Sequence, residues 1–349
     1  MNNEINHDTG ESDANPLVTF ALFAYNQEEY IHQALEGAFS QTYSRLEIIL
    51  SDDCSTDKTF EIMEREAAAY KGPHKVVARQ TERNRGTMLH VAEVAGLAQG
   101  ELLVLAAGDD ISKPNRTRVL VAAWQATGAW GLCSRFDRID PSGLLLESSV
   151  ASEVLAGHGF RDFFHEEEGP VRIVHGCSSA YDAQAFDYLK LSPEDFILSE
   201  DGAMSVLLNL LGKAIANLDD SLVCYRESPN SLTNSRTRSM LTFATIAEDE
   251  KRIEWFACAQ ANRCRLFLRM NDYLGVARTR RMKVDAVKAE LARQTIRANW
   301  RQIGFVDRVS FALRNRSSTW AFPRLLGLNV FYMAKWLARR FAVGGGSVE

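Results

Sequence analysis

The chain has 349 residues, 46% of them hydrophobic and 24% charged, so it can bury a sizeable core. The net charge of −5 conceals an asymmetry: residues 1–250 carry 20 basic against 39 acidic side chains, and residues 251–349 carry 20 against 6. The acidic part argues against a nucleic-acid channel, which Lys and Arg would line. The basic part suits an anionic membrane surface or the chain's own acidic part.

Cysteines and termini point to a cytoplasmic protein. The six cysteines are scattered, without the C-x-x-C pairs of zinc or redox sites, and no secretory signal opens the chain, so we expect reduced thiols. We expect residues 1–15 to be disordered and residues 344–349 to form a flexible end. No stretch supplies the roughly 20 apolar residues of a membrane-spanning helix.

Strand-like and helix-like segments alternate through the first 140 residues. An apolar run at 17–24 predicts a strand buried on both faces. Asn26, with Glu29 three residues later, predicts a capped helix next. Further strands are predicted over 46–51 and 75–78. The helix between them is expected to turn its apolar side chains inward.

The alternation continues through two more helices. Thr87 begins a helix that Gly100 ends, a strand follows over 101–106, and Pro114 and Gly128 mark the start and end of the next helix. This order predicts an α/β fold with a doubly wound, mixed but mainly parallel sheet of the Rossmann type.

Beyond residue 140 the pattern is irregular. We expect a short helix over 160–164, strands over 173–181 and 222–225, and a buried helix over 201–211 that Gly212 ends. From about residue 239 the pattern is helical. Two sets of apolar residues there each fall on one helix face: Val284, Val287 and Leu291, and Val306, Val309 and Leu313.

Two of the predicted strands end in adjacent carboxylates. Asp52 and Asp53 follow the strand at 46–51, and Asp109 and Asp110 follow the strand at 101–106. In open α/β sheets, ligands bind outside the carboxyl ends of the strands. The chain has neither a Walker loop nor a complete G-x-G-x-x-G motif, so we expect phosphate to be bound through a metal.

Six segments in order resemble the family 2 glycosyltransferases of the GT-A fold. They lie at 18–26, 34–43, 52–57, 84–101, 108–116 and 199–202. The resemblance implies a GT-A domain over 16–235, with a nucleotide-binding half at 16–110 and an acceptor half at 111–235. A basic helical region at 236–343 would follow as a C-terminal appendage.

The resemblance also implies a nucleotide site. Asp53 would bind the base or ribose, with Asp52 in support. If this pair is considered by itself, the alternative is a solvated turn in which Ser55 caps the next helix. The other implied nucleotide-binding residues are Phe23, Tyr25, Arg85 and Asp109. Asp109 and Asp110 would also bind Mg²⁺ or Mn²⁺, against the alternative of an Asp-rich turn.

Asp201 is the candidate general base, by resemblance to the family's Glu-Asp pair. An inverting transfer needs one carboxylate to take the proton of the acceptor hydroxyl. Metal-bound diphosphate then leaves without a second acid, unlike in glycosidases. Glu200 would orient the site or contact the acceptor. The structural alternative for Asp201 is an N-cap of the following helix.

Some positions depart from the family pattern. Family members often carry an Asp at the position of Ala107. They also carry a Tyr-Arg-x-His segment, in which Ser228 replaces the His here. Because that His can bind the metal, the third metal ligand is left open. Arg226 in that segment would pair with phosphate or form a surface salt bridge. We assign no role to His175, because a lone His is more often structural.

These features predict an inverting, metal-dependent glycosyltransferase in surface polysaccharide or glycolipid synthesis. It would move a sugar from a nucleotide-sugar, a UDP-sugar above all, to a hydroxyl of a glycan or lipid-linked acceptor. The basic region, with aromatic residues such as Trp300 and Trp336, suits peripheral contact with the inner face of the membrane, packing on the catalytic domain, or a homodimer. The alternatives are a non-catalytic binding module of the same fold and a nucleotidyltransferase.

Overall fold

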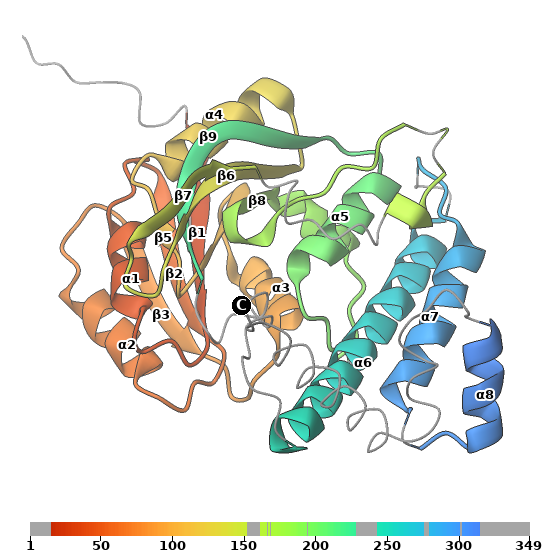
Figure 1. Cartoon of the computed structure of the whole chain (residues 1–349). Coiled ribbons are helices and arrows are strands. Elements are labelled where there is room, and N and C mark those ends of the chain that lie inside the picture. The colour runs from red at the N-terminus through yellow and green to blue at the C-terminus, as the bar shows by residue number, and fades with distance from the viewer. Residues whose placement is uncertain are drawn as a thin grey trace, which may run out of the picture. The chain divides into compact units, whose positions relative to one another are not determined.

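The computed structural model describes residues 15–151, 161–165, 167, 169–193, 195–227, 243–275, 279–300 and 302–314. The chain divides into two compact units (Figure 1). The first comprises residues 1–234 with 262–288, and the second comprises 235–261 with 289–349. The expected flexible ends at 1–14 and 344–349, Ser228 and the aromatic residues of the tail beyond 314 lie outside the described residues.

Nine strands among the described residues form one sheet in the first unit, in the order β3-β2-β1-β4-β8-β6-β9-β5, with β7 paired to β6. The pairs β1–β2, β1–β4, β2–β3 and β6–β9 are parallel, and the others are antiparallel. The strands are β1 Val18–Ala24, β2 Leu46–Asp52, β3 Lys75–Gln80, β4 Leu102–Ala107, β5 Ile111–Ser112, β6 Gly131–Ile139, β7 Leu145–Val150, β8 Ser179–Asp182 and β9 Ile215–Arg226. The predicted α/β fold with a mixed, mainly parallel sheet is confirmed.

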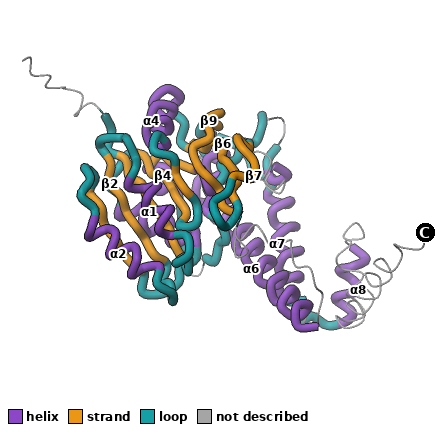
Figure 2. Tube along the Cα trace, turned by 60° about the vertical axis from the view of Figure 1, so that its left-hand side comes forward, coloured by secondary structure: helices purple, strands orange, loops and turns teal. Residues whose placement is uncertain are grey.

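Helices cover both faces of the parallel strands (Figures 1 and 2). Phe20 and Leu22 of β1 pack in one core with side chains of α1, α2 and α4, while α3 and α5 contact each other elsewhere in the unit. Strands β1 and β2 are apolar on both faces because both faces are covered. The helices of this unit are α1 Ile31–Phe39, α2 Thr59–Ala69, α3 Thr87–Leu97, α4 Arg116–Thr127 and α5 Glu200–Leu210.

Three helices follow: α6 Phe243–Leu274, α7 Val284–Ala298 and α8 Phe305–Arg314. None of the helices in the described part of the chain is long and apolar enough to span a membrane. In the second unit, Trp300 packs with Phe311 and Ala312 of α8. The apolar face expected on α8 is largely exposed, since Val306 and Leu313 are 78% and 47% exposed, whereas Phe311 and Ala312 are buried.

The predicted helix cap at Asn26 is wrong, and so is the alternative of a cap at Ser55, because both side chains form other hydrogen bonds. Asn26 has a left-handed φ of 51°, its Oδ1 accepts from the N–H of Thr56, and α1 begins only at Ile31. Ser55 donates its hydroxyl to Asp52, and Asp57 accepts from the N–H of Thr59 at the start of α2.

Two predicted strands also differ in extent. The strand expected over 173–181 is confined to β8, after a 3₁₀ turn at Gly176–Ser178. The strand expected over 222–225 is the end of the much longer β9, which pairs along β6.

We predict that Gly100→Ala destabilises the domain. Gly100 lies beyond the end of α3, where its N–H donates to the Thr19 hydroxyl, and a Cβ would lie 2.3 Å from the backbone nitrogen of Thr19. The main chain of β1 cannot give way cheaply, so we expect a loss of about 1–3 kcal/mol in the free energy of unfolding, measured by urea denaturation.

Gly96→Ala is the matched control. Gly96 is an exposed residue of α3 with no atoms near a built Cβ, so alanine there should stabilise by about 0.5–1 kcal/mol through helix propensity. Equal effects of the two substitutions would contradict the close approach at Gly100.

Candidate active site

The carboxyl ends of three parallel strands bring the two acidic pairs together. Strand β1 lies between β2 and β4, with Ala24 opposite Asp52 and Phe23 opposite Ala107. The N–H of Asp53 donates to Ala24 O at 2.9 Å, and the N–H of Gly108 donates to Phe23 O at 2.8 Å. The pairs at 52–53 and 109–110 therefore flank the end of β1 at one edge of the sheet.

Two predicted aromatic residues belong to this edge. Tyr25, directly after β1, is 46% exposed, so its ring is available to a ligand. Phe23 lies within β1 and packs edge-on against the ring of His90, with centroids 5.0 Å apart.

Asp52 is fully buried and bonded within the protein. Its carboxylate accepts from the N–H and hydroxyl of Ser55, at 2.7 and 2.5 Å, and from the Gln80 amide at 2.9 Å. These bonds fix the turn between β2 and α2. Asp52 thus supports its neighbour Asp53.

Asp53 holds the loop before α3. Its Oδ1 accepts from the N–H of Arg85 at 2.7 Å and from the hydroxyl of Thr81 at 3.2 Å, and its Oδ2 accepts from the N–H of Gly86 at 2.9 Å. Gly86 has a φ of 73°, which favours glycine. A carboxylate offers about four acceptor sites, so Asp53 retains capacity for one further donor.

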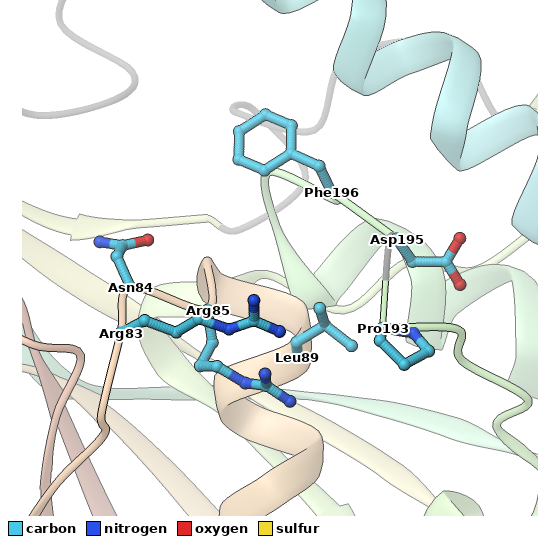
Figure 3. Close-up of a pocket in the computed structure, with 7 residues that line it drawn as sticks. All are labelled: Arg83, Asn84, Arg85, Leu89, Pro193, Asp195 and Phe196. Atoms are coloured by element: carbon cyan, nitrogen blue, oxygen red, sulfur yellow. The ribbon is translucent and has the colours of Figure 1, made fainter.

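A pocket of about 210 Å³ opens beside this loop (Figure 3). The guanidinium groups of Arg83 and Arg85 point the same way within it, while the carboxylate of Asp195 points away from them. Asp195 accepts instead from the N–H of Ser192 and pairs with Arg269. The lining residues are Arg83, Asn84, Arg85, Leu89, Pro193, Asp195 and Phe196.

The pocket joins two distant segments of the chain. Arg83, Asn84 and Arg85 belong to the loop that Asp53 holds, and Leu89 belongs to α3. Pro193, Asp195 and Phe196 come from the segment that leads into α5. Phe196 lies against Gly86, since a Cβ built there would meet its ring at 3.6 Å.

In the second acidic pair, Asp110 is buried and Asp109 is partly exposed, and their adjacent charges are unfavourable. Burial, and then the neighbouring charge of Asp109, raise the pKa of Asp110 well above its usual value. Burial also raises the pKa of Asp109, although Arg226 and a hydrogen bond from Gln27 oppose the shift. Gly108 fits closely beside the pair, because a Cβ there would lie 2.9 Å from the Cβ of Ala24.

The pair fits a divalent cation that is shared with a substrate. The described residues contain no group of three or more His, Cys, Asp or Glu side chains arranged to hold a metal. Mg²⁺, however, usually binds one or two carboxylates together with substrate phosphates and water. A cation would also favour the ionised forms of Asp109 and Asp110, whose pKa values burial raises.

The third acidic pair opens α5. The helix begins at Glu200 with Ser199 as the N-cap residue, so the alternative of Asp201 as N-cap is wrong. Asp201 Oδ1 accepts from the N–H of Gly202 at 2.6 Å, and its Oδ2 accepts from the N–H of Gly176 at 3.3 Å. Burial, and then the charge of Asp201, raise the pKa of Glu200 to about 8.

Segment 175–179 connects the second and third acidic pairs. The pKa of the Cys177 thiol is raised well above its usual value by burial, then by Asp110 and, more weakly, by Asp201. One thiol therefore lies within electrostatic reach of both carboxylates. The buried Arg116 ties the same region together, because its guanidinium donates to the carbonyls of Leu105 and Ser179.

Two side chains of this segment, His175 and Cys177, have no role assigned from the sequence. His175 stacks on Phe136 with ring centroids 5.1 Å apart, and its Nδ1 lies 3.1 Å from Cys177 Sγ. Burial lowers the pKa of His175, and the charge of Asp201 opposes the shift. A lone His and a lone Cys carry no sequence signal; only the fold places them beside Asp201.

For Arg226, the alternative of a surface salt bridge is wrong. The side chain is 1% exposed, and its Nε donates to the carbonyl of Asp109 at 2.8 Å.

Residues 19–189 match the model of glycosyl transferase family 2. This part of the chain belongs to that family. An uncharacterised protein of Mycobacterium tuberculosis is 43% identical over 94 residues, 27% of this chain and 27% of that protein. The succinoglycan biosynthesis protein ExoO of Rhizobium meliloti is 30% identical over 139 residues, 40% of this chain and 38% of that protein. The alignments thus span about a quarter to two fifths of these relatives.

Two solved structures resemble the chain at low identity. TarS of S. aureus in complex with UDP-GlcNAc has a TM-score of 0.49 at 15% identity, covering 81% of this chain and 72% of that one. The mannosyltransferase PcManGT of Pyrobaculum calidifontis, in complex with GDP-Man and Mn²⁺, has a TM-score of 0.48 at 16% identity, covering 93% and 86%.

We predict that Glu200→Gln removes a pH dependence of stability. The folded carboxyl has a pKa of about 8, against an ordinary value of 4.5, so the folded state binds this proton more tightly. Stability from this group is therefore lost as pH rises from about 4.5 through about 8. The melting temperature of the wild type should fall more steeply across this window than that of the variant.

The exposed Asp220 provides the control, since Asp220→Asn should leave the pH profile of melting unchanged. Parallel profiles for the wild type and Glu200→Gln would contradict the buried, protonated state of Glu200.

Proposed function

We propose that the chain is an inverting, metal-dependent glycosyltransferase. It moves a sugar from a nucleotide-sugar, a UDP-sugar above all, to a hydroxyl of a glycan or lipid-linked acceptor in surface polysaccharide or glycolipid synthesis. The observation that carries this proposal is the meeting of two acidic pairs at the ends of β2 and β4, with Asp201 of the third pair near the same Cys177 thiol as Asp110, in a chain whose residues 19–189 match the family 2 model. The same proposal takes residues 16–110 as the donor half and residues 111–235 as the acceptor half.

The donor site lies along the end of β1 and the loop before α3. Asp53, which retains an acceptor site, would bind a base N–H or ribose hydroxyl, with Asp52 in support. The exposed ring of Tyr25 suits stacking on the base, and Phe23 backs this edge through His90. The pocket supplies the Arg85 guanidinium.

The diphosphate would lie toward Asp109 and Asp110, which would hold Mg²⁺ or Mn²⁺. When bound, the ion would neutralise the charge that develops on the departing diphosphate. The two carboxylates supply hard oxygen ligands at the end of β4, close to the β1 end where the nucleotide would lie.

Asp201 would take the proton of the acceptor hydroxyl. Its partly exposed carboxylate lies at the start of α5, held by the N–H groups of Gly176 and Gly202. Glu200 stays protonated near pH 7 because its pKa is about 8, so it would donate a hydrogen bond and leave proton acceptance to Asp201. Two neighbouring carboxyl groups thus take different roles.

The proposal also includes membrane contact and dimer formation. They rest on the excess of basic over acidic side chains after residue 250. A lipid-linked acceptor would agree with membrane contact.

We predict that Asp201→Asn reduces turnover by about 10²–10⁴-fold with little change in donor binding, because it removes only the proton acceptor. The measurement is release of free UDP from a panel of nucleotide-sugars with candidate acceptors. Asp220→Asn on the exposed part of β9 is the control and should keep full turnover. Near wild-type turnover by folded Asp201→Asn would refute the assignment of the base.

We also predict that Mn²⁺ strengthens UDP binding. A ligand that binds only the folded state at about 100 times its Kd stabilises that state by about 2.7 kcal/mol, which raises the melting temperature by several degrees. Asp109→Asn and Asp110→Asn should lose the Mn²⁺-dependent part of this rise, whereas Asp220→Asn should keep it.

Two outcomes would replace the proposal. Pyrophosphate release from a nucleoside triphosphate would indicate the nucleotidyltransferase. Nucleotide or glycan binding without turnover of any sugar donor would indicate a non-catalytic module.

A further inference from the structure

Arg226, the last residue of β9, is a buried guanidinium beneath the second acidic pair. Its side chain is 1% exposed, which is unusual for an arginine and requires that its donors be satisfied within the protein. Nε donates to the carbonyl of Asp109 at 2.8 Å. The backbone N–H of Arg226 donates to Asp110 Oδ1 at 2.9 Å. A single residue thus contacts both members of the pair.

The rest of the guanidinium joins this pair to two other elements. One terminal nitrogen donates to the carbonyls of Asp140, at 3.2 Å, and Pro141, at 2.8 Å, in the turn between β6 and β7. The other donates to the side chain of Gln33 on α1. The guanidinium carbon lies over the ring of Tyr30, 4.9 Å from its centroid.

This arrangement ties both acids of the pair to one residue. The backbone N–H of Arg226 holds the Asp110 carboxylate, and its Nε holds the main chain at Asp109. The planar guanidinium donates in several fixed directions, so it can hold the backbone at Asp109 without bonding to the Asp109 carboxylate itself.

We propose that Arg226 is a positioning residue for the divalent cation. It fixes the main chain at Asp109 and holds Asp110 through its own N–H, so that both carboxylates are preorganised as metal ligands. This inference rests on the proposed function, because it takes Asp109 and Asp110 as the ligands. It assigns to Arg226 a role away from the phosphate groups. The guanidinium already makes four hydrogen bonds within the protein: one from Nε, two from one terminal nitrogen and one from the other.

The test is Arg226→Lys in the full chain, with metal affinity as the readout. Lysine keeps the positive charge and the backbone N–H but cannot reach the carbonyls of Asp109, Asp140 and Pro141 together. Loss of a residue that orients metal ligands typically costs 10–100-fold in metal affinity, so we expect the Mn²⁺ concentration that half-saturates UDP binding to rise by about 10-fold or more. Binding is measured by titration calorimetry and by the Mn²⁺ electron paramagnetic resonance signal.

Arg135→Lys is the matched control. The Arg135 guanidinium on β6 donates to the exposed Asp219 and to the carbonyl of Ser149, so the half-saturating Mn²⁺ concentration should stay at the wild-type value. UDP binding measured without metal should also be unchanged in Arg226→Lys, which a general loss of structure would not allow.

If Arg226→Lys does not fold, Tyr30→Leu provides the second variant. It removes the ring under the guanidinium and should raise the half-saturating Mn²⁺ concentration by about 2–5-fold, less than the loss of the arginine itself. The role of Arg226 would be overturned if folded Arg226→Lys bound Mn²⁺ as tightly as the wild type. The same holds for Tyr30→Leu where that variant is used instead. Either result would leave the proposed function standing. UDP binding by the wild type that does not depend on Mn²⁺ would overturn the metal part of the proposed function together with the role of Arg226.

Discussion

The parallel pairing of β1 with β2 and β4 is the constraint on which the site depends. It places two acidic pairs at neighbouring strand ends, where like charges repel. The chain treats the two pairs differently. Asp52 and Asp53 accept hydrogen bonds from Ser55, Gln80, Arg85 and Gly86, which spread their charge into the surrounding loops. Asp109 and Asp110 receive less compensation, and burial raises the pKa of both. The stronger need for a cation therefore lies at the end of β4.

A similar division of roles operates within the third pair. Glu200 is buried beneath the start of α5 with its pKa raised to about 8, whereas Asp201 is partly exposed and accepts from two main-chain N–H groups. A proton-bearing carboxyl beside an acceptor avoids two adjacent negative charges in a poorly solvated place. Gly176 also packs closely against this pair, because a Cβ there would lie 3.0 Å from Glu200 Oε1.

The parallel half of the fold could be predicted because its signals are local. Continuous apolar runs gave β1, β2 and β4, and carboxylates at the strand ends followed from the chain order. Asn26 had a capping partner nearby in the sequence, but its side chain accepts from Thr56 across a loop. Ser55 accepts from the N–H of Asn26 and donates to Asp52 instead of capping α2. The surroundings of Arg226 depend on elements from α1 to β9, which no local pattern links. The stacking of His175 on Phe136, and the place of Cys177 near Asp110 and Asp201, could not be predicted for the same reason.

The charges of the site indicate which end would bind the nucleoside of a donor and which end would bind its diphosphate. A nucleoside diphosphate is an anion, and without a cation its phosphates would meet Asp109 and Asp110 at unfavourable range. The arginines of the pocket lie instead beside the loop that Asp53 holds, next to where the base or ribose would bind. A divalent ion held by Asp109 and Asp110 would reverse the local sign of charge, so that the diphosphate would be attracted to that end of the sheet rather than repelled by the acids.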